Sequence, residues 1–314
     1  MKILIVCSGN NPYRINPFIK EQAESLNNHG IDIDYFLIKG KGFLGYLSNL
    51  PKLRKTIKSK KIDLVHAHYG LSGMLAILQR IRPVTITFHG SDINIRKNKI
   101  ISKIAMKFST HNIFVEKSLI KKIRAKKNYT LLSCGVNLDE NLPMDKKFCR
   151  KQLGLNLESK FALFSSSFDK KVKNYQLAKK AIDLVGGVEL LELKGYNRKE
   201  VNMLMNACDL LLVTSFSETG PLVVKEAMAC NCPIVTTDVG DVREVIGNTN
   251  GCYITSYDPK DVANKIKKTL EFRGKTNGRE KATHLDINNV AKEIINIYRK
   301  VIPESNKKHI KNQN

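Results

Sequence analysis

The segment SFSETGPLVVKEAMACNCPIVTTDVGDVREVIGNTNG, residues 215–251, carries the strongest signal for the fold of this chain. It sets Glu218 and Glu226 eight positions apart, with a Gly-Pro pair between them and an apolar run on either side. Proline is favoured at the first position of a helix, because the N–H that it lacks would have no partner there. We therefore predict a helix from Pro221 to about Cys230, between two buried strands.

The start of this helix is a predicted anion site. The first N–H groups of a helix have no intrahelical partner, and the N-terminal end of the helix dipole is positive. These groups should face the loop at Thr219 and Gly220. Glu226 should lie about 7 Å along the helix, and helical side chains lean back toward the N-terminus. A ligand with a phosphate at the helix start and hydroxyls beside it would meet both Glu226 and Glu218.

Either glutamate alone has an ordinary explanation, because a Glu on a helix usually faces solvent. Glu226, however, belongs to the apolar run 223–230, so much of the surface around it should be buried. A buried carboxylate is costly unless it is hydrogen-bonded. Taken together, the two glutamates and the helix start favour a ligand site.

The length and composition set broad limits. A chain of 314 residues suits two domains of about 150 residues each. No segment reaches the roughly 20 apolar residues of a membrane span, and the first apolar run, 3–7, reads as a strand and not as a signal peptide. The seven cysteines lack C-x-x-C spacing, which favours reduced thiols. We predict a cytoplasmic protein, with the inner face of the cytoplasmic membrane as a candidate location.

The net charge of +24 is concentrated in the first half of the chain. Residues 1–150 carry 27 Lys/Arg and 10 Asp/Glu, giving +17, and the remainder carries 26 and 19, giving +7. An AT-rich genome would explain this excess of lysine, and so would attraction to a polyanionic surface. No nucleic-acid-binding motif accompanies the charge, so no nucleic acid is predicted as a partner.

An anionic membrane surface remains a candidate partner. Apolar residues repeat at helical spacing over 43–57 beside several lysines, and further basic runs follow at 96–107 and 117–127. The apolar stripe either faces the core or belongs to a surface that contacts anionic lipid.

Short apolar runs alternate with helical patterns along nearly the whole chain. This alternation predicts an α/β fold with two doubly wound parallel-sheet domains facing across a cleft. The predicted domains are 1–145 and 146–286, with 137–147 as the linker region. A C-terminal helix within 287–302 is expected to pack back toward the first domain, and 303–314 to form a disordered basic tail. The predicted strands are 3–7, 33–38, 64–67, 84–88, 113–115 and 130–133, then 162–165, 189–193, 210–214, 234–236 and 252–254.

Two common nucleotide-binding motifs are absent from the sequence. The loop after the first strand contains a single glycine, Gly9, and therefore lacks the G-x-G-x-x-G pattern of dinucleotide-binding enzymes. No P-loop lysine motif is present either.

Basic side chains lie at the predicted carboxyl ends of strands. His89 follows the strand 84–88, and His66 and His68 end the strand before it, on one face. This H-x-H pair could bind a metal, but no third ligand has suitable spacing, so no metal is predicted. Lys170 and Lys173 stand in the loop after the first strand of the second domain, where a lysine could neutralise a diphosphate.

These motifs resemble glycosyltransferase family 4, the retaining enzymes of the two-domain GT-B fold. The resemblance spans the chain and rests on VHAHYG, TFHGSD, SCGVN and VKNYQLAKKA, and above all on the E-x7-E pair followed by EAMACNCP and DVGDVREVI. The chain is most similar to bacterial members that build capsule, exopolysaccharide or lipopolysaccharide. The resemblance implies an acceptor-binding first domain and a second domain that binds a nucleotide-sugar donor.

The resemblance also implies roles for single residues. Glu226 would bind the ribose of the donor, and Glu218 the transferred sugar. His89 would contact the sugar, and Lys173 the diphosphate, so that the catalytic set is His89, Lys173 and Glu218. The remaining substrate-binding residues would be Gly9, Lys170, Thr219, Gly220 and Leu222, with backbone N–H groups near Gly220 and Leu222 holding the sugar and phosphate.

Two positions depart from the family pattern. Thr219 stands where members usually have glycine, and the arginine that usually accompanies Lys173 is missing, with Lys170 among the nearest substitutes. The implied activity is retaining hexosyl transfer to a lipid-linked saccharide acceptor, without a metal or other cofactor. A sugar-nucleotide epimerase or phosphorylase on the same fold, or a non-catalytic nucleotide-sugar-binding subunit, is the alternative.

Overall fold

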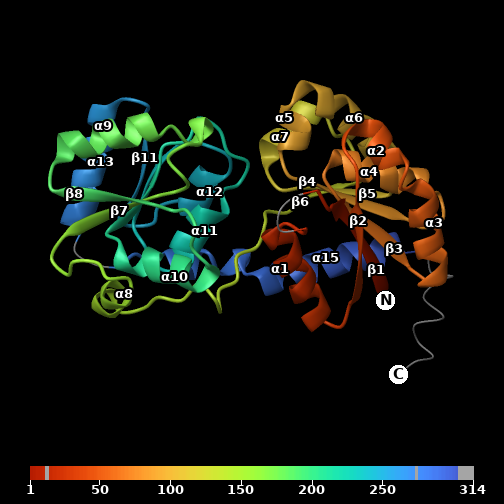
Figure 1. Ribbon diagram of the computed structural model, residues 1–314, viewed down its shortest axis with the longest axis horizontal. Helices are drawn as coiled ribbons and strands as arrows, with labels where there is room; N and C mark the ends of the chain where they lie inside the picture. Colours follow the sequence, from red (N-terminus) through yellow and green to blue (C-terminus); the bar gives the residue numbers. More distant parts are fainter. Residues whose placement is uncertain (11–13, 273–274, 303–314) are drawn as a thin grey trace. The chain divides into compact units, whose positions relative to one another are not determined.

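The computed structural model describes residues 1–10, 14–272 and 275–302. They form two compact units, Met1–Cys134 with the C-terminal segment from Ile287, and Gly135–Asp286 (Figure 1). No helix of the described residues is long and apolar enough to cross a membrane.

The chain enters and leaves the second unit through paired segments. The N–H of Val136 donates to the carbonyl of Leu285 at 2.9 Å, and Val136 forms an isolated parallel bridge with Asp286. The guanidinium of Arg279 donates to the carbonyls of Leu138 and Asn141. These contacts attach the polar segment after Cys134 to the second unit. The first unit therefore ends at 134 and not at the predicted 145, and 137–147 is not a linker.

The first unit is built on a six-stranded parallel sheet with strand order β2-β1-β3-β4-β5-β6. Residues of its central strands, such as Ile3 and Leu64, pack against Ile294 and Tyr298 of the last helix. The C-terminal helix is thus part of the first unit. The strands are β1 Lys2–Ser8, β2 Asp32–Ile38, β3 Leu64–His68, β4 Val84–Phe88, β5 His111–Phe114 and β6 Tyr129–Leu131, and the helices are α1 Pro17–Asn28, α2 Gly42–Leu47, α3 Leu50–Ser59, α4 Gly70–Leu78, α5 Ser91–Asn94, α6 Arg96–Phe108, α7 Lys117–Ile123 and α15 Ile287–Val301.

The second unit is built on a five-stranded parallel sheet with strand order β11-β10-β9-β7-β8. Its central strand is apolar on both faces, because Leu210 and Leu212 point into one core cluster and Leu211 and Val213 into the other. Helices cover both faces as a result. The strands are β7 Lys160–Phe164, β8 Val188–Glu192, β9 Leu210–Val213, β10 Ile234–Thr237 and β11 Cys252–Thr255, and the helices are α8 Lys146–Gln152, α9 Tyr175–Val185, α10 Arg198–Ala207, α11 Leu222–Ala229, α12 Val242–Ile246, α13 Pro259–Glu271 and α14 Gly278–Lys281, with 3-10 turns Lys171–Lys173 and Thr283–Leu285.

The helix predicted from Pro221 is present with slightly different ends. It runs over Leu222–Ala229, and Pro221 is the N-cap residue with extended backbone angles (φ −67°, ψ 115°). The N–H of Val224 donates to the carbonyl of Pro221 at 3.1 Å, which closes the first turn.

The apolar stripe predicted over 43–57 is partly buried and partly exposed. Leu53 and Ile57 are core residues, whereas the apolar side chains at its start are exposed.

Candidate active site

The loop after β9 is fixed by hydroxyl groups on neighbouring strand ends. Thr214 and Ser215 follow β9 directly and are fully buried. Thr214 Oγ1 lies 3.0 Å from the carbonyl oxygens of Lys173 and Asn174, in the loop after β7. Thr237 Oγ1, at the end of β10, donates to the carbonyl of Ser215 at 2.8 Å. The carboxyl ends of three adjacent strands are therefore joined at one edge of the sheet.

Lys173 and Glu218 form an ion pair at this edge. The Lys173 ammonium lies 2.5 Å from Glu218 Oε1, and both side chains are largely buried. Ser215 Oγ donates to the same carboxylate oxygen at 2.7 Å. Two residues predicted from separate motifs, 45 positions apart, thus meet directly, and Ser215 is a partner that the sequence did not reveal.

Two glycines allow the loop and the turn after β10 to approach closely. Gly220 has φ +91° and Gly240 has φ +60°, a region that L side chains rarely adopt. A Cβ atom at Gly240 would lie 2.6 Å from the backbone nitrogen of Gly220. Beside this contact, the fully buried Lys225 ammonium lies 2.9 Å from Asp241 Oδ2, and this ion pair links α11 to the start of α12. The motif DVGDVREVI therefore supports the loop that carries Glu218.

The start of α11 presents backbone N–H groups beside this loop. Thr219, Gly220 and Leu222 are all partly exposed, whereas Pro221 is buried. The N–H groups of Leu222 and Val223 precede the first hydrogen bond of the helix, which Val224 donates to Pro221, so this end of the helix suits a negative group. Thr219, Gly220 and Leu222 thus follow directly after Glu218, which is paired with Lys173.

Glu226 lies one turn further along α11 and is 7% exposed. Burial raises the pKa of its carboxyl group, and the nearby Arg198 guanidinium opposes this shift. Arg198 Nη1 lies 2.5 Å from Glu226 Oε1. Sequence reasoning missed this arginine, because it lies in neither motif of the glutamate pair. The available signal, the capping pattern Asn197-x-x-Glu200, predicts only that a helix starts there.

Lys170 takes no part in this cluster. Its side chain is exposed, and its carbonyl accepts from the N–H of Lys173 at 2.8 Å in the turn after β7. A guanidinium is present at the second glutamate, where Arg198 of α10 contacts Glu226.

In the first unit, Gly9 and His89 lie after β1 and β4. The N–H of Gly9 donates to the carbonyl of Ile38 at 2.9 Å, and a Cβ at Gly9 would lie 3.0 Å from the Cβ of Leu37. His89 Nε2 lies 3.0 Å from His68 Nδ1, and its ring contacts the ring of Tyr69. Burial lowers the pKa of His89 to about 3, so its imidazole is neutral at physiological pH.

Hydrogen bonds within the first unit hold His66, the first residue of the H-x-H pair. His66 Nδ1 lies 2.5 Å from the hydroxyl of Tyr298, and Nε2 lies 2.8 Å from Thr87 Oγ1, so both ring nitrogens of His66 have protein partners. His66 stacks on His68 with ring centroids 4.6 Å apart. Within the described ranges, no group of three or more His, Cys, Asp and Glu side chains is arranged to hold a metal ion.

Asp92 joins the segments that follow β3 and β4. Its carboxylate accepts from the N–H of Gly90 at 2.8 Å and from the N–H of Gly70 at 3.1 Å. Burial raises the pKa of Asp92 to about 6. The motif TFHGSD therefore fixes the loop conformation around His89.

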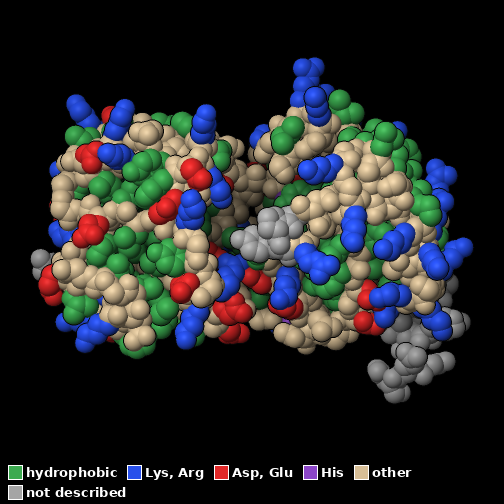
Figure 2. Space-filling view, viewed as in Figure 1, with side chains coloured by type: hydrophobic (Ala, Val, Ile, Leu, Met, Phe, Trp, Pro, Cys, Tyr) green, Lys and Arg blue, Asp and Glu red, His purple; other side chains and the backbone are tan. Residues whose placement is uncertain are grey.

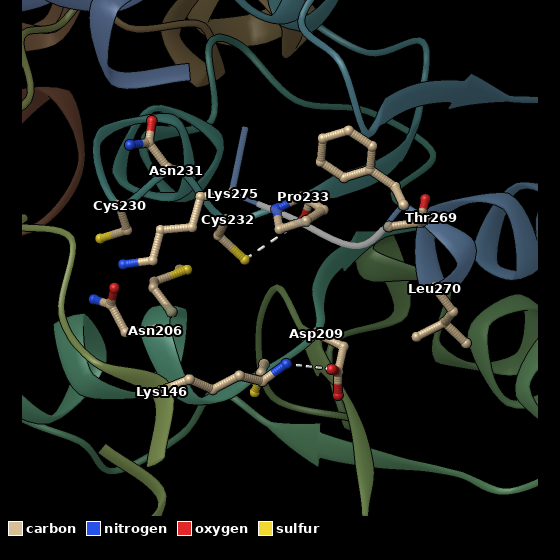
Figure 3. Close-up of a pocket in the computed structure, with 13 residues that line it drawn as sticks. Lys146, Asn206, Asp209, Cys230, Asn231, Cys232, Pro233, Thr269, Leu270 and Lys275 are labelled. Carbon is tan, nitrogen blue, oxygen red and sulfur yellow. Dashed lines mark hydrogen bonds and ion pairs between the residues drawn. The ribbon is translucent and has the colours of Figure 1, made fainter. Parts of the chain in front are cut away.

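A pocket of about 270 Å³ lies elsewhere in the second unit. Asp209 and Pro233, which immediately precede β9 and β10, line it, so it lies at the amino edge of the sheet (Figure 3). The ammonium of Lys146 is bonded to the Asp209 carboxylate there. This pocket is remote from the Glu218 loop, because that loop follows the opposite ends of the same strands.

Comparison with known proteins identifies the family. The Glycosyltransferase Family 4 model matches residues 8–140, and the model for glycosyl transferases group 1 matches residues 187–286. An uncharacterised glycosyltransferase of Methanocaldococcus jannaschii is 30% identical over 74% of this chain and 75% of its own length. The N,N'-diacetylbacillosaminyl-diphospho-undecaprenol alpha-1,3-N-acetylgalactosaminyltransferase of Campylobacter jejuni is 27% identical over 82% of this chain and 82% of its own length.

A solved structure shares the fold. HepE of Anabaena, in complex with UDP and glucose, superposes with a TM-score of 0.74 at 18% identity and covers 96% of this chain and 100% of that one. The chain belongs to glycosyltransferase family 4, and its two parallel α/β units have the GT-B fold. It is therefore a glycosyltransferase, which confirms the class predicted from the sequence.

Proposed function

We propose that this protein is a retaining hexosyltransferase that needs no metal and transfers a sugar from a nucleotide-sugar donor to a lipid-linked saccharide. The observation that carries the proposal is the cluster of Lys173, Glu218 and the start of α11, with Glu226 one turn further along the same helix. The cluster combines a cation, backbone donors and two carboxylates at one sheet edge. It suits a ligand with both phosphate and hydroxyl groups.

The donor would be held by charge at one end and by hydrogen bonds at the other. Glu226 would accept from the ribose hydroxyls, and Glu218 with Thr219 and Gly220 would hold the sugar. Lys173 and the N–H groups near Leu222 would hold the diphosphate. A protein of the same fold, HepE of Anabaena, is solved with UDP and glucose, so the fold accommodates ligands of this class.

The charges of the reaction match this arrangement. As the bond between the anomeric carbon and the diphosphate oxygen breaks, the sugar ring becomes positive and the diphosphate gains negative charge. Lys173 and the helix start stabilise the leaving diphosphate without a metal. Electrostatic donors of this kind commonly contribute about 3–4 kcal/mol each.

Retention is proposed through front-face transfer. Glu218 is a poor candidate for a covalent nucleophile, because Lys173 and Ser215 both bind its Oε1. The leaving diphosphate then accepts the proton of the attacking hydroxyl, and the new glycosidic bond forms on the face that the diphosphate leaves. His89, which is neutral at physiological pH, would contact the sugar, and Gly9 would lie beside the acceptor.

The acceptor is proposed to be a lipid-linked saccharide. The name of the Campylobacter relative describes a sugar joined through diphosphate to undecaprenol. An acceptor of this class would place the protein in bacterial cell-surface polysaccharide synthesis, such as that of capsule or lipopolysaccharide. It also requires the protein to work on the inner face of the cytoplasmic membrane.

The surface of α6 supports contact with an anionic membrane. Ile100, Ile104 and Phe108 follow one another at helical spacing and are 63%, 41% and 67% exposed. The same helix carries five basic residues and no acidic one, and Figure 2 shows Lys and Arg side chains over the visible face of this unit. An exposed apolar ridge of this kind, with flanking positive charge, suits an anionic bilayer surface.

Donor, metal independence and stereochemistry are testable in one assay series. A thermal-shift screen with UDP-, GDP-, ADP- and TDP-sugars identifies the donor, and the Glu226→Ala variant serves as control. Turnover is then measured with polyprenyl-diphosphate-linked saccharides in the presence of EDTA, and NMR gives the anomeric configuration of the product. Inversion, or loss of turnover in EDTA that a divalent cation restores, would refute the corresponding part of the proposal.

The alternative activities give different products. An epimerase changes the donor sugar in the absence of acceptor, and a phosphorylase requires inorganic phosphate. A non-catalytic binding subunit shows a thermal shift with a nucleotide sugar but no turnover with any acceptor. Incubation of the donor alone, with phosphate and with acceptor therefore separates these cases.

Membrane contact has its own test. Wild-type protein is expected to sediment with phosphatidylglycerol vesicles but not with phosphatidylcholine vesicles. Replacing Lys99 and Lys103 with Gln should weaken binding about fivefold per charge, and Ile104→Ser with Phe108→Ser should also weaken it. Lys179→Gln with Lys180→Gln, on exposed positions of α9, is the matched control. Equal binding to both vesicle types would contradict the proposal.

A further inference from the structure

The pairing of Arg198 with Glu226 joins a buried carboxylate to a partly exposed cation. The Glu226 side chain is 9% exposed, and the Arg198 side chain is 44% exposed, so the pair extends from the protein interior toward solvent. Val224, Ala227 and Met228 of the same helix belong to a hydrophobic core cluster. Without a cation, a carboxylate in this position would favour its protonated form.

Arg198 is held in place by the start of its helix. It is the first residue of α10, and Asn197 and Glu200 close a capping box around it. Asn197 Oδ1 accepts from the N–H of Glu200 at 3.1 Å, and Glu200 Oε2 accepts from the N–H of Asn197 at 2.7 Å. The thiol of Cys230, just beyond α11, also donates to Asn202 Oδ1 of α10 at 3.0 Å. The backbone of Arg198 is therefore fixed relative to α11.

Other charged groups near α11 do not replace Arg198. Lys225 lies on α11 itself and is paired with Asp241, the N-cap residue of α12. Arg279 of α14 donates to the backbone carbonyl of Ala229 and to two further carbonyls. Burial raises the pKa of the Cys230 thiol to about 12, so this group is uncharged. In the described parts of the chain, Arg198 is the cation whose charge lowers the pKa of Glu226.

We propose that Arg198 is a positioning residue that keeps Glu226 ionised and oriented to bind the vicinal hydroxyls of the donor ribose. This inference rests on the proposed donor site. An ionised carboxylate has about four acceptor positions, so one guanidinium N–H leaves room for two hydroxyls. Protonation would convert one of these acceptors into a donor and weaken the match to the diol. Arg198 thus extends donor binding to lower pH.

The first measurement is the affinity for nucleotides as a function of pH. Calorimetry with UDP, ADP and GDP between about pH 5 and 8.5 identifies the nucleotide that wild-type protein binds, and the same nucleotide is used for the variants. In Arg198→Gln, the pH below which affinity falls should rise by about one unit or more. Arg198→Lys retains the charge and should recover most of the wild-type profile. Lys199→Gln removes the same charge from the next, exposed position and should leave the profile unchanged.

The second measurement needs no ligand. Because burial leaves the pKa of Glu226 above its value in the unfolded chain, folding is penalised as pH rises through the folded-state pKa. In Arg198→Gln this pKa rises further, so the free energy of unfolding should fall more steeply from about pH 5 to 8 than in wild type. The double variant Arg198→Gln with Glu226→Gln should lose this additional dependence.

The outcomes separate the inference from the proposed function. If no nucleotide binds wild type but the unfolding profiles differ as expected, Arg198 controls the ionisation of Glu226, and the donor assignment fails. If Arg198→Gln and Lys199→Gln give the same profiles in both measurements, the positioning role is refuted, whatever the protein binds. A lower affinity of Arg198→Gln that does not vary with pH would also refute it, because the arginine would then contact the ligand directly.

Discussion

Glu218 and the diphosphate of the proposed donor would compete for the ammonium of Lys173. Their contact of 2.5 Å holds the ammonium at the sheet edge and keeps the carboxylate from lying unpaired in a partly buried site. A bound diphosphate would attract the same ammonium. On the proposed function, the gain for catalysis would then come from charge that grows on the diphosphate during bond cleavage, which a lysine in place would stabilise more in the transition state than in the ground state.

Replacing Lys173 by Ala should therefore lower kcat by about 10²–10³ and change the donor KM less. Steady-state kinetics against donor concentration measures both constants. Lys170→Ala is the control, because its side chain is exposed and outside the cluster. An increase in KM with unchanged kcat would argue that Lys173 only binds the donor.

Replacing Glu226 by Ala should leave the protein folded and weaken donor binding. Hydrogen bonds to a charged group contribute about 1.5–3 kcal/mol, which corresponds to a loss of roughly 10- to 150-fold in affinity. Calorimetry with the donor measures the loss, and circular dichroism checks the fold. Unchanged affinity would refute the ribose assignment.

Among the elements, the tight turn after β10 is the one whose shape most directly supports the Glu218 loop. Gly240 has a positive φ, and any Cβ at this position would lie 2.6 Å from a backbone nitrogen, so two separate requirements exclude a larger residue. Gly154 has a similar φ of +66° but open space around it. An alanine at either position is strained by the positive φ, but only at Gly240 does it also meet a close backbone atom. Comparing the two positions therefore separates the destabilisation caused by the backbone angle from that caused by the close contact.

Gly240→Ala should destabilise the protein by roughly 1–3 kcal/mol more than Gly154→Ala does, and it should lower activity by displacing the loop. Chemical denaturation gives the difference in the free energy of unfolding. An equal loss of unfolding free energy in the two variants would show that the close approach of Gly240 to Gly220 does not contribute to stability.

Local patterns predicted the elements well and the side-chain pairs poorly. All eleven strands of the described residues were predicted near their observed positions, because most of them contain a short apolar run of the kind that parallel sheets bury on both faces. The contacts of Lys173 with Glu218 and of Arg198 with Glu226 span 45 and 28 positions. They depend on the order β8-β7-β9 in the sheet, which the periodicity of single segments does not contain. The glutamate roles could be predicted only through the family resemblance.

At the scale of the whole molecule, the first unit combines the N-terminal segment with the C-terminal helix α15. The hydroxyl of Tyr298, on α15, lies 2.5 Å from His66 Nδ1 on β3, and both side chains are fully buried. Tyr298→Phe keeps the ring and leaves this imidazole nitrogen without its partner. The free energy of unfolding should fall by about 1–3 kcal/mol, as measured by urea denaturation. An unchanged midpoint with an unchanged slope would contradict the structural role assigned to His66.

The pairing of Val136 with Leu285 marks the second unit as an insertion, and this affects folding during synthesis. Domains generally fold as the ribosome releases them, the earlier ones first. Here the first 134 residues emerge first but lack α15, which is made only after all of Gly135–Asp286. The second unit is therefore complete, and free to fold, while the earlier unit still exposes the apolar surface that its last helix will cover.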